Sequence, residues 1–168
     1  MKFIIIIILI ISVALGSIWL YRYINSGNET MNNQLISINA LCNGKKECVY
    51  VGEELAVNVV ITNIHSEPIE VPIKFLQQRG PSITLINEGT EQELVLPTNP
   101  ANPELINDRI TIQPNGTSRI SWIIHDDEIR SVGGDTVDIN VEVTLASPIY
   151  RGGVITEVIT ESNFKITH

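Results

Sequence analysis

After residue 34 the chain alternates apolar and polar residues over most of its length. A period of two residues is the pattern of a β-strand that buries one of its faces. No apolar stripe with a 3.6-residue period appears in this part of the chain, so we expect eight or nine short strands and no helix there. The clearest alternation is formed by Ile139, Val141, Val143 and Leu145. Other segments of this kind are 36–40, 55–61, 69–75, 83–85, 94–96, 110–112, 120–124, 154–160 and 163–167.

Turn residues between these segments indicate how the strands connect. Asn87-Glu88-Gly89-Thr90 lies between two apolar segments, as in a β-hairpin, and Pro114-Asn115-Gly116 forms a second predicted turn. Pro72 interrupts the segment 69–75. Because proline has no N–H to donate, we expect this strand at a sheet edge or at a bulge. Many short strands separated by turns are typical of an antiparallel β-sandwich.

A different pattern occupies residues 3–21, which contain no charged residue and include eight consecutive isoleucine and leucine residues. A helix of this length crosses a hydrocarbon core of about 30 Å. Aromatic residues around Arg22 resemble the belt found at a membrane interface and favour an uncleaved anchor. The alternative is a signal peptide cleaved after Ala14-Leu15-Gly16.

We therefore expect three regions: a transmembrane anchor at 1–24, a polar linker at 25–33 and one β-rich domain at 34–168. The linker has no apolar periodicity, and the domain is long enough to bury a core. Lys2 and Arg22 nearly balance each other across the anchor, so the positive-inside rule alone does not orient it. The acidic domain and its paired cysteines favour an extracytoplasmic domain on a single-pass anchor.

Cys42 and Cys48 are the only two cysteines, and Asn43-Gly44 between them favours a tight turn. We expect a small loop closed by a disulfide, which implies an oxidising compartment. The alternative is a pair of free thiols in the cytosol. A zinc site is disfavoured because the spacing is not C-x-x-C and because His65 and His125 are distant in sequence.

Charge argues against several kinds of partner. The net charge is −8, and only Lys2 and Arg22 flank the apolar stretch, so the remaining chain carries nine basic and 19 acidic residues. Binding to nucleic acid depends on clustered Lys and Arg, so we expect no nucleic-acid partner. Attraction to an anionic membrane surface is disfavoured for the same reason. Contact with the membrane is expected through residues 3–21 alone.

The sequence lacks the local motifs of common catalytic sites, among them G-x-S-x-G, H-E-x-x-H, a phosphate-binding glycine loop and the EF-hand. We therefore predict no enzyme activity, no cofactor and no metal site. The acidic cluster at 125–128, with Asp135 and Asp138, is an open alternative as a Ca²⁺ site. Its residues have no fixed ligand spacing, and clustered charges are more often solvated.

The segment from Val51 to Asn63, VGEELAVNVVITN, followed by SEPI at 66–69, resembles immunoglobulin-like modules of secreted or membrane-anchored prokaryotic proteins. Pro114-Asn-Gly-Thr117 before the strand with Trp122 is a second shared element. The resemblance covers about residues 50–145 and implies an all-β fold, an antiparallel immunoglobulin-like β-sandwich. These motifs belong to a fold and not to an activity. The Cys…Trp…Cys core of antibody domains is absent.

The loop at 97–107 is the strongest candidate for a binding site. Its prolines recur at every third position and stiffen it toward polyproline II. Long ordered loops on a β-sandwich often bind partners, although a spacer between the two sheets is an equal alternative. The predicted contact residues are Pro97, Asn99, Pro100, Pro103, Leu105 and Ile106.

The leading hypothesis is a membrane-tethered extracytoplasmic interaction module that binds a protein partner without catalysis. One alternative is a protease inhibitor of immunoglobulin-like fold. The chain has a Gly-Gly loop but lacks the N-P-T-T-G and R-P-W patterns of chagasin-like inhibitors. A second alternative is a hydrolase with an unrecognised site, because catalytic groups need not form a local motif.

Overall fold

The structure, a computed structural model, describes residues 34–134 and 138–167. The predicted anchor at 1–24 and linker at 25–33 lie outside these residues and stay predictions. In the described ranges there is no helix with the length and apolar character needed to cross a membrane.

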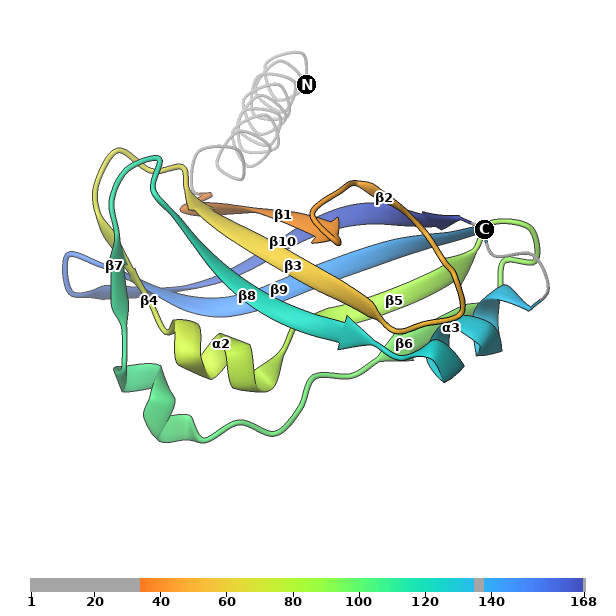
Figure 1. Ribbon diagram of the computed structural model, residues 1–168. Helices are drawn as coiled ribbons and strands as arrows, with labels where there is room; N and C mark the ends of the chain where they lie inside the picture. The colour runs from red at the N-terminus through yellow and green to blue at the C-terminus, as the bar shows by residue number, and fades with distance from the viewer. Residues whose placement is uncertain (1–33, 135–137, 168) are drawn as a thin grey trace, which may run out of the picture. The chain divides into compact units, whose positions relative to one another are not determined.

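The described chain folds into two β-sheets (Figure 1). The first, sheet A, is antiparallel, with the strand order β1-β3-β8. Because β3 is central, β1 and β8 are the edges of this sheet. Its strands are β1 (Ile36–Cys42), β3 (Leu55–Asn63) and β8 (Thr117–Ile124).

The second sheet, sheet B, is built around a long hairpin of β9 and β10, each 14 residues long (Figure 1). Strand β2 pairs with β10 in parallel, and the other pairs in this sheet are antiparallel. On its other side β9 pairs with β5 and β4, which in turn pair with β6 and β7. The strands are β2 (Glu47–Val49), β4 (Ile69–Val71), β5 (Ser82–Asn87), β6 (Glu93–Leu96), β7 (Ile110–Ile112), β9 (Asp138–Arg151) and β10 (Val154–Thr167).

The core consists of the alternate residues of these strands, and the alternation predicted from the sequence is confirmed. Val141 is fully buried, whereas Glu142, the next residue, is exposed. Each large apolar side chain buried in this way contributes about 1.5–3 kcal/mol of transfer free energy. The predominantly β prediction is therefore confirmed. Five further apolar residues of the predicted alternating segments are also buried, namely Val57, Val59, Ile61, Ile139 and Val143.

Two α-helices contradict the prediction that residues after 34 form no helix. They are α2 (Ile73–Arg79) and α3 (Asp126–Gly133), and a 3₁₀ helix, η1 (Pro103–Asn107), follows β6. Helix α2 begins directly after Pro72, where the missing N–H has no helical partner to lose. Ile73 and Phe75 are two residues apart, so together they imitate a strand. In the helix both pack against the core beside Leu76, which is fully buried.

The prediction that Pro72 places its strand at a sheet edge or at a bulge is also wrong. Strand β4 ends at Val71, so Pro72 interrupts no ladder. The strand is not at an edge either, since Ile69–Val71 pairs with β7 on one side and Glu70 pairs with Tyr150 of β9 on the other.

The predicted disulfide is present. Cys42 and Cys48 are joined with an S–S distance of 2.03 Å. Asn43 and Gly44 both have positive φ, and the Cys42 N–H donates to the Lys45 carbonyl at 2.8 Å. The Asn-Gly pair therefore forms the tight turn that brings the two sulfurs together.

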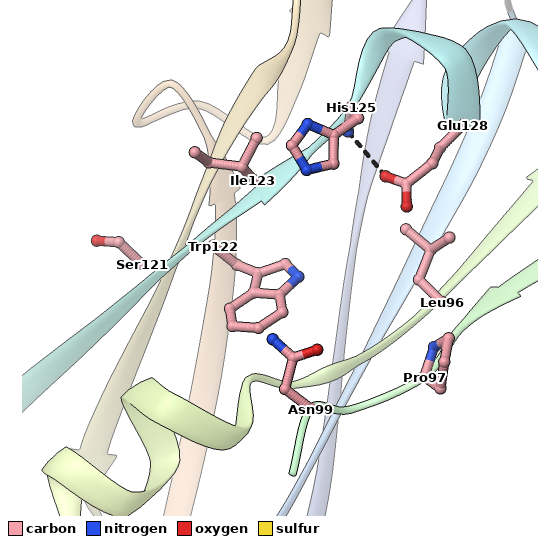
Figure 2. Close-up of a pocket in the computed structure, with 8 residues that line it drawn as sticks. All are labelled: Leu96, Pro97, Asn99, Ser121, Trp122, Ile123, His125 and Glu128. Atoms are coloured by element: carbon pink, nitrogen blue, oxygen red, sulfur yellow. Dashed lines mark hydrogen bonds between the residues drawn. The ribbon is translucent and has the colours of Figure 1, made fainter. Parts of the chain in front are cut away.

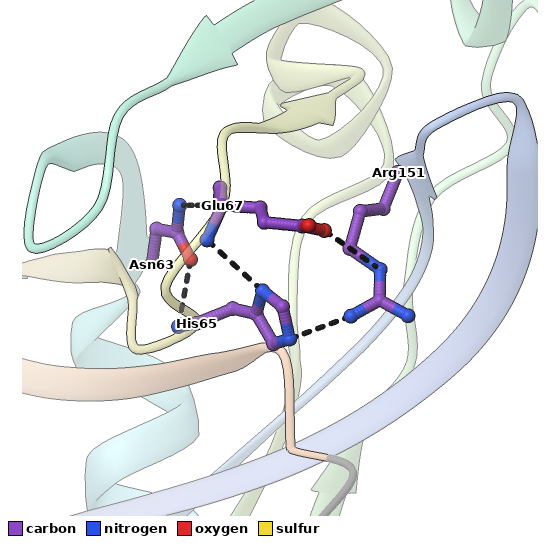
Figure 3. Close-up of polar contacts among 4 residues, drawn as sticks. All are labelled: Asn63, His65, Glu67 and Arg151. Carbon is purple, nitrogen blue, oxygen red and sulfur yellow. Dashed lines mark hydrogen bonds and ion pairs between the residues drawn. The ribbon is translucent and has the colours of Figure 1, made fainter.

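At one end of the domain a turn of sheet A meets the tip of the β9–β10 hairpin (Figure 3). Asn63 is fully buried, and its Nδ2 donates to the Glu67 carbonyl at 2.9 Å while its Oδ1 accepts from the His65 N–H at 2.9 Å. Arg151 from the hairpin contacts His65, and its Nε lies 3.9 Å from Glu67 Oε2. His65 thus forms part of this turn and its polar contacts. It lies far from His125, because the nearby Thr62 pairs with Thr117 at the start of β8, whereas His125 follows the end of that strand.

Candidate functional site: a groove between two sheet edges

A groove of about 470 Å³ opens between β8 of sheet A and the end of β6 in sheet B (Figure 2). Within the described residues β6 pairs with β5 alone, so the groove lies where an edge of one sheet faces an edge of the other. Helix α3 closes one end of it. The lining residues are Leu96, Pro97, Asn99, Ser121, Trp122, Ile123, His125 and Glu128.

Trp122 forms the apolar wall of the groove. Its indole is half-buried and packs against the core, and a Cβ on Gly80 would lie only 2.5 Å from that ring. Gly80 also has a φ of +73°, a conformation that residues with a Cβ rarely adopt. A glycine at the end of α2 therefore makes the room in which Trp122 lies.

The open edge of β8 offers backbone groups to the groove. Gln77 of α2 binds both backbone groups of Ser121: its Nε2 donates to the carbonyl at 2.7 Å and its Oε1 accepts from the N–H at 2.9 Å. These groups therefore point away from β3. Because the direction alternates along an antiparallel strand, the N–H and C=O of Ile123 point the same way. In the described structure β8 pairs with no strand on that side.

Strand β6 has an open edge of its own. The Asn87 N–H donates to the Gln92 carbonyl at 2.9 Å. In this register the backbone N–H and C=O groups of the even-numbered residues of β6 point toward β5. The backbone groups of Val95 therefore point outward, and its side chain is 58% exposed.

The polar end of the groove is acidic. The His125 N–H donates to Glu128 Oε2 at 2.8 Å, which caps α3, and His125 Nδ1 lies 3.6 Å from Glu54 Oε2. No Lys or Arg is among the eight lining residues. The cluster at 125–128 is thus the first turn of a helix, where acidic side chains are favourable. Within the described ranges, no three His, Cys, Asp or Glu side chains converge as a metal site requires.

Helix α3 is held in place by contacts with the segment before β3. The Tyr50 hydroxyl donates to Asp126, and Arg130 Nε donates to both Asp126 Oδ1 at 3.0 Å and the Tyr50 hydroxyl at 3.1 Å. These hydrogen bonds, from Tyr50 first and then Arg130, lower the pKa of Asp126. Burial, followed by the bond to Asp126, raises the pKa of Tyr50. The three groups fix the helix that carries His125 and Glu128.

The six predicted contact residues of the 97–107 loop separate into two groups. Pro97 and Asn99 line the groove, and the Asn99 N–H donates to the Arg79 carbonyl at 2.7 Å. Pro103, Leu105 and Ile106 instead belong to η1, which contacts α2. The apolar side chains of Leu105 and Ile106 are half-buried.

Pro100 lies between these groups and is exposed, and it does not line the groove. From the sequence, His125 is expected only in the acidic cluster at 125–128, and neither Trp122 nor Ile123 is expected at a binding site. The available signal was Trp122 itself, because tryptophan joins a large apolar ring to a polar N–H and is often found where a packed face meets an accessible one.

No known protein family matches the chain, and no curated protein matches it. Among solved structures, the Northeast Structural Genomics Consortium target SoR45 is 10% identical, with a TM-score of 0.45 over 80% of this chain and 87% of that one. A protein from Archaeoglobus fulgidus is 12% identical, with a TM-score of 0.36 over 79% and 95%. The sporulation control protein Spo0M of Bacillus subtilis is 14% identical, with a TM-score of 0.40 over 80% and 49%. All three TM-scores lie below 0.5, so these similarities carry no argument about function.

Proposed function

We propose that this chain is a non-catalytic, membrane-tethered module that binds an extended segment of a protein partner outside the cytoplasm. Residues 3–21 would hold it in the membrane, and residues 34–168 would form an immunoglobulin-like β-sandwich that presents the groove. The observation that carries this proposal is the open backbone edge at Ile123 beside the apolar wall of Trp122.

An extended peptide fits this combination of groups. Its backbone would hydrogen-bond to the N–H and C=O of Ile123 and so add a short strand to the edge of sheet A. The side chain of Gln77 already forms two hydrogen bonds of this kind with the backbone N–H and C=O of Ser121, the neighbouring outward-facing residue on the same edge. One apolar side chain of the peptide would pack against Leu96, Pro97 and Trp122.

The charge of the groove favours a basic partner segment. Glu128 lines the groove and Glu54 lies beside His125, with no Lys or Arg among the lining residues. A Lys or Arg of the partner, placed two residues from the apolar side chain, would share its face of the extended chain. Such a rim charge contributes mainly to specificity and association rate.

Tethering lowers the affinity that this module needs. A partner in the same membrane meets the groove at a raised effective concentration, so weak intrinsic binding of a short segment is enough. A small peptide site of this kind is consistent with a groove that has only one aromatic wall.

Selection from a displayed library of random nonapeptides tests the proposal on the full chain. We expect enriched peptides to carry an apolar residue two positions from a Lys or Arg. Asn99→Arg should weaken their binding at least about tenfold, because it places a positive charge in the groove. Asn39→Arg is the matched control, since Asn39 is an exposed residue of β1 that does not line the groove.

The control should bind as well as the original chain. Equal weakening by the two substitutions, or enriched peptides that do not respond to Asn99→Arg, would place peptide binding elsewhere and refute the proposed site.

A further inference from the structure

One end of the domain carries three exposed apolar side chains, those of Ile64, Val154 and Ile155, which we call the tip surface. They are 47%, 62% and 58% exposed. Val154 pairs with Arg151 across the β9–β10 hairpin, and Arg151 in turn contacts His65 (Figure 3). Because Ile64 directly precedes His65, these contacts bring the three apolar side chains to the same end of the domain.

The turn at the tip of this hairpin is open. Gly152 and Gly153 form it, both with positive φ, which lets the chain reverse direction within two residues. Apart from the adjoining residues, no atom of the described chain lies within 4 Å of a Cβ built on either glycine. The turn therefore projects beyond the packed part of the domain.

The charged groups at this end compensate one another. Arg151 Nε lies 3.9 Å from Glu67 Oε2, and Arg109 Nη1 lies 3.2 Å from Glu70 Oε2. The Arg109 guanidinium also lies over the Tyr150 ring, with its Cζ 4.0 Å from the ring centroid. Arginine and tyrosine side chains next to exposed apolar ones are the combination found where proteins meet a membrane interface.

The chain enters the domain at this same end. The Ile64 N–H donates to the Leu35 carbonyl at 3.2 Å, so the start of the domain lies beside the tip surface. The predicted linker at 25–33 separates Leu35 from the predicted anchor. A linker of that length spans at most about 30 Å. An anchor at 3–21 would therefore keep the tip surface close to the bilayer.

We propose that the tip surface inserts into the headgroup region of the membrane that holds the anchor. This rests on the membrane tether of the proposed function and adds a second contact to residues 3–21, the only segment for which the sequence predicts one. Burial of apolar surface drives the insertion, so it needs no anionic lipid and is compatible with an acidic domain. The groove lies toward the opposite end of β8 and would be held away from the bilayer.

Fluorescence quenching in the full chain, reconstituted in phosphatidylcholine vesicles, tests this contact. Cys42 and Cys48 form a disulfide, so one added cysteine takes a single fluorophore. A doxyl group on the upper part of the lipid chain should quench Val154→Cys at least about threefold more strongly than Val51→Cys. Val51 is the matched control, because it is 73% exposed and follows Tyr50, which contacts α3 at the other end of the domain.

A fluorophore on Ser12→Cys, in the middle of residues 3–21, separates the tip contact from the anchor. A doxyl group deep in the lipid chain should quench it. If it does, and Val154→Cys is quenched no more than Val51→Cys, the tip contact is overturned while the anchor stands. Lack of quenching at position 12 would refute the tether, and the tip contact with it.

A charge placed in the tip surface gives a second test, with the fluorophore on Ile64→Cys. Ile155→Asp should lower quenching by the upper doxyl group at least about twofold, because a carboxylate disfavours burial in the interface. The control Ile159→Asp adds the same charge at a residue that is 68% exposed on the same strand, four positions further from the tip. It should retain at least about 80% of the quenching.

Equal losses in these two variants, or no loss with Ile155→Asp, would overturn the proposal. The unfolding midpoint verifies that each variant is folded. If Ile155→Asp unfolds the domain, the comparison of Val154→Cys with Val51→Cys still decides.

Discussion

Gly80 and Trp122 define the groove at the level of single residues. The indole occupies the space where any other residue at position 80 would place its Cβ, so one glycine determines the position of the apolar wall. Trp122 belongs to the alternating segment 120–124, whose apolar residues are expected to face the core, and its half-buried position confirms this in part. Its contact with Gly80 is 42 positions away in the chain and carries no local signal.

Gly80→Ala should destabilise the domain by at least about 2 kcal/mol, from the clash with Trp122 and from the positive φ. Gly152→Ala is the matched control, because Gly152 also has positive φ but has no atom within 4 Å of the added Cβ. It should cost only about 1 kcal/mol. Chemical denaturation measures both values. Equal losses would mean that the Gly80–Trp122 contact contributes nothing beyond backbone strain.

A second pair of variants tests the alternation of faces on β9. Val141→Asp should cost at least about 3 kcal/mol, since it buries an unpaired charge, and Glu142→Lys should be nearly neutral at its exposed position. Unfolding midpoints in urea report the difference. Similar midpoints for the two variants would contradict the assignment of faces.

At the level of elements, period-two alternation predicted the strands well because it reports burial directly. It failed for α2 and α3, which are seven and eight residues long and so give only about two turns. For α3 a local signal existed: three acidic residues begin the helix, and the buried Ile129 and Val132 are three residues apart. For α2, Ile73 and Phe75 continued the apparent alternation of β4 past Pro72.

Helix α3 also gives a prediction about pH. The hydrogen bonds of Tyr50 and Arg130 lower the pKa of Asp126 in the folded state, so its carboxylate stabilises the fold at pH values above its unfolded pKa of about 3.9. That contribution is lost as pH falls below about 4 toward the lower folded pKa. The stability difference between the original chain and Asp126→Asn should therefore be constant from about pH 7 to 5 and shrink below pH 4.

Unfolding curves at several pH values measure this difference. A stability difference between the original chain and Asp126→Asn that stays constant down to pH 3 would show that Asp126 titrates alike in the folded and unfolded states. Such a result would remove it from the contacts that hold α3 beside the groove.

At the scale of the whole molecule, the sequence predicted the strands but not the site. The groove combines residues 96–99 with residues 121–128, and only the pairing of β8 with β3 and of β6 with β5 brings these segments together. Such long-range pairing has no signature in one sequence. The loop prediction therefore located two of the lining residues, Pro97 and Asn99, while the remaining predicted contacts form η1 against α2.

The predicted anchor gives a further prediction for the whole molecule, namely its association with the membrane. After carbonate washing the protein should stay with the membrane, because residues 3–21 are uncharged and long enough to cross it. Protease added outside the cytoplasmic membrane should remove the domain from about residue 30 onward. A mature protein that begins at Ser17 would instead show that the segment is a cleaved signal peptide.

Site-specific photocrosslinking in the membrane of the cells that make this protein tests most directly whether the groove binds a partner segment. A benzophenone amino acid replaces Asn99 in the groove or, as a control, the exposed Asn39. We expect an adduct from position 99 alone. Mass spectrometry should map it to one partner segment with an apolar residue two positions from a Lys or Arg, and a library-selected peptide should compete it away. Identical adducts from both positions, or an adduct that the peptide does not displace, would contradict the account.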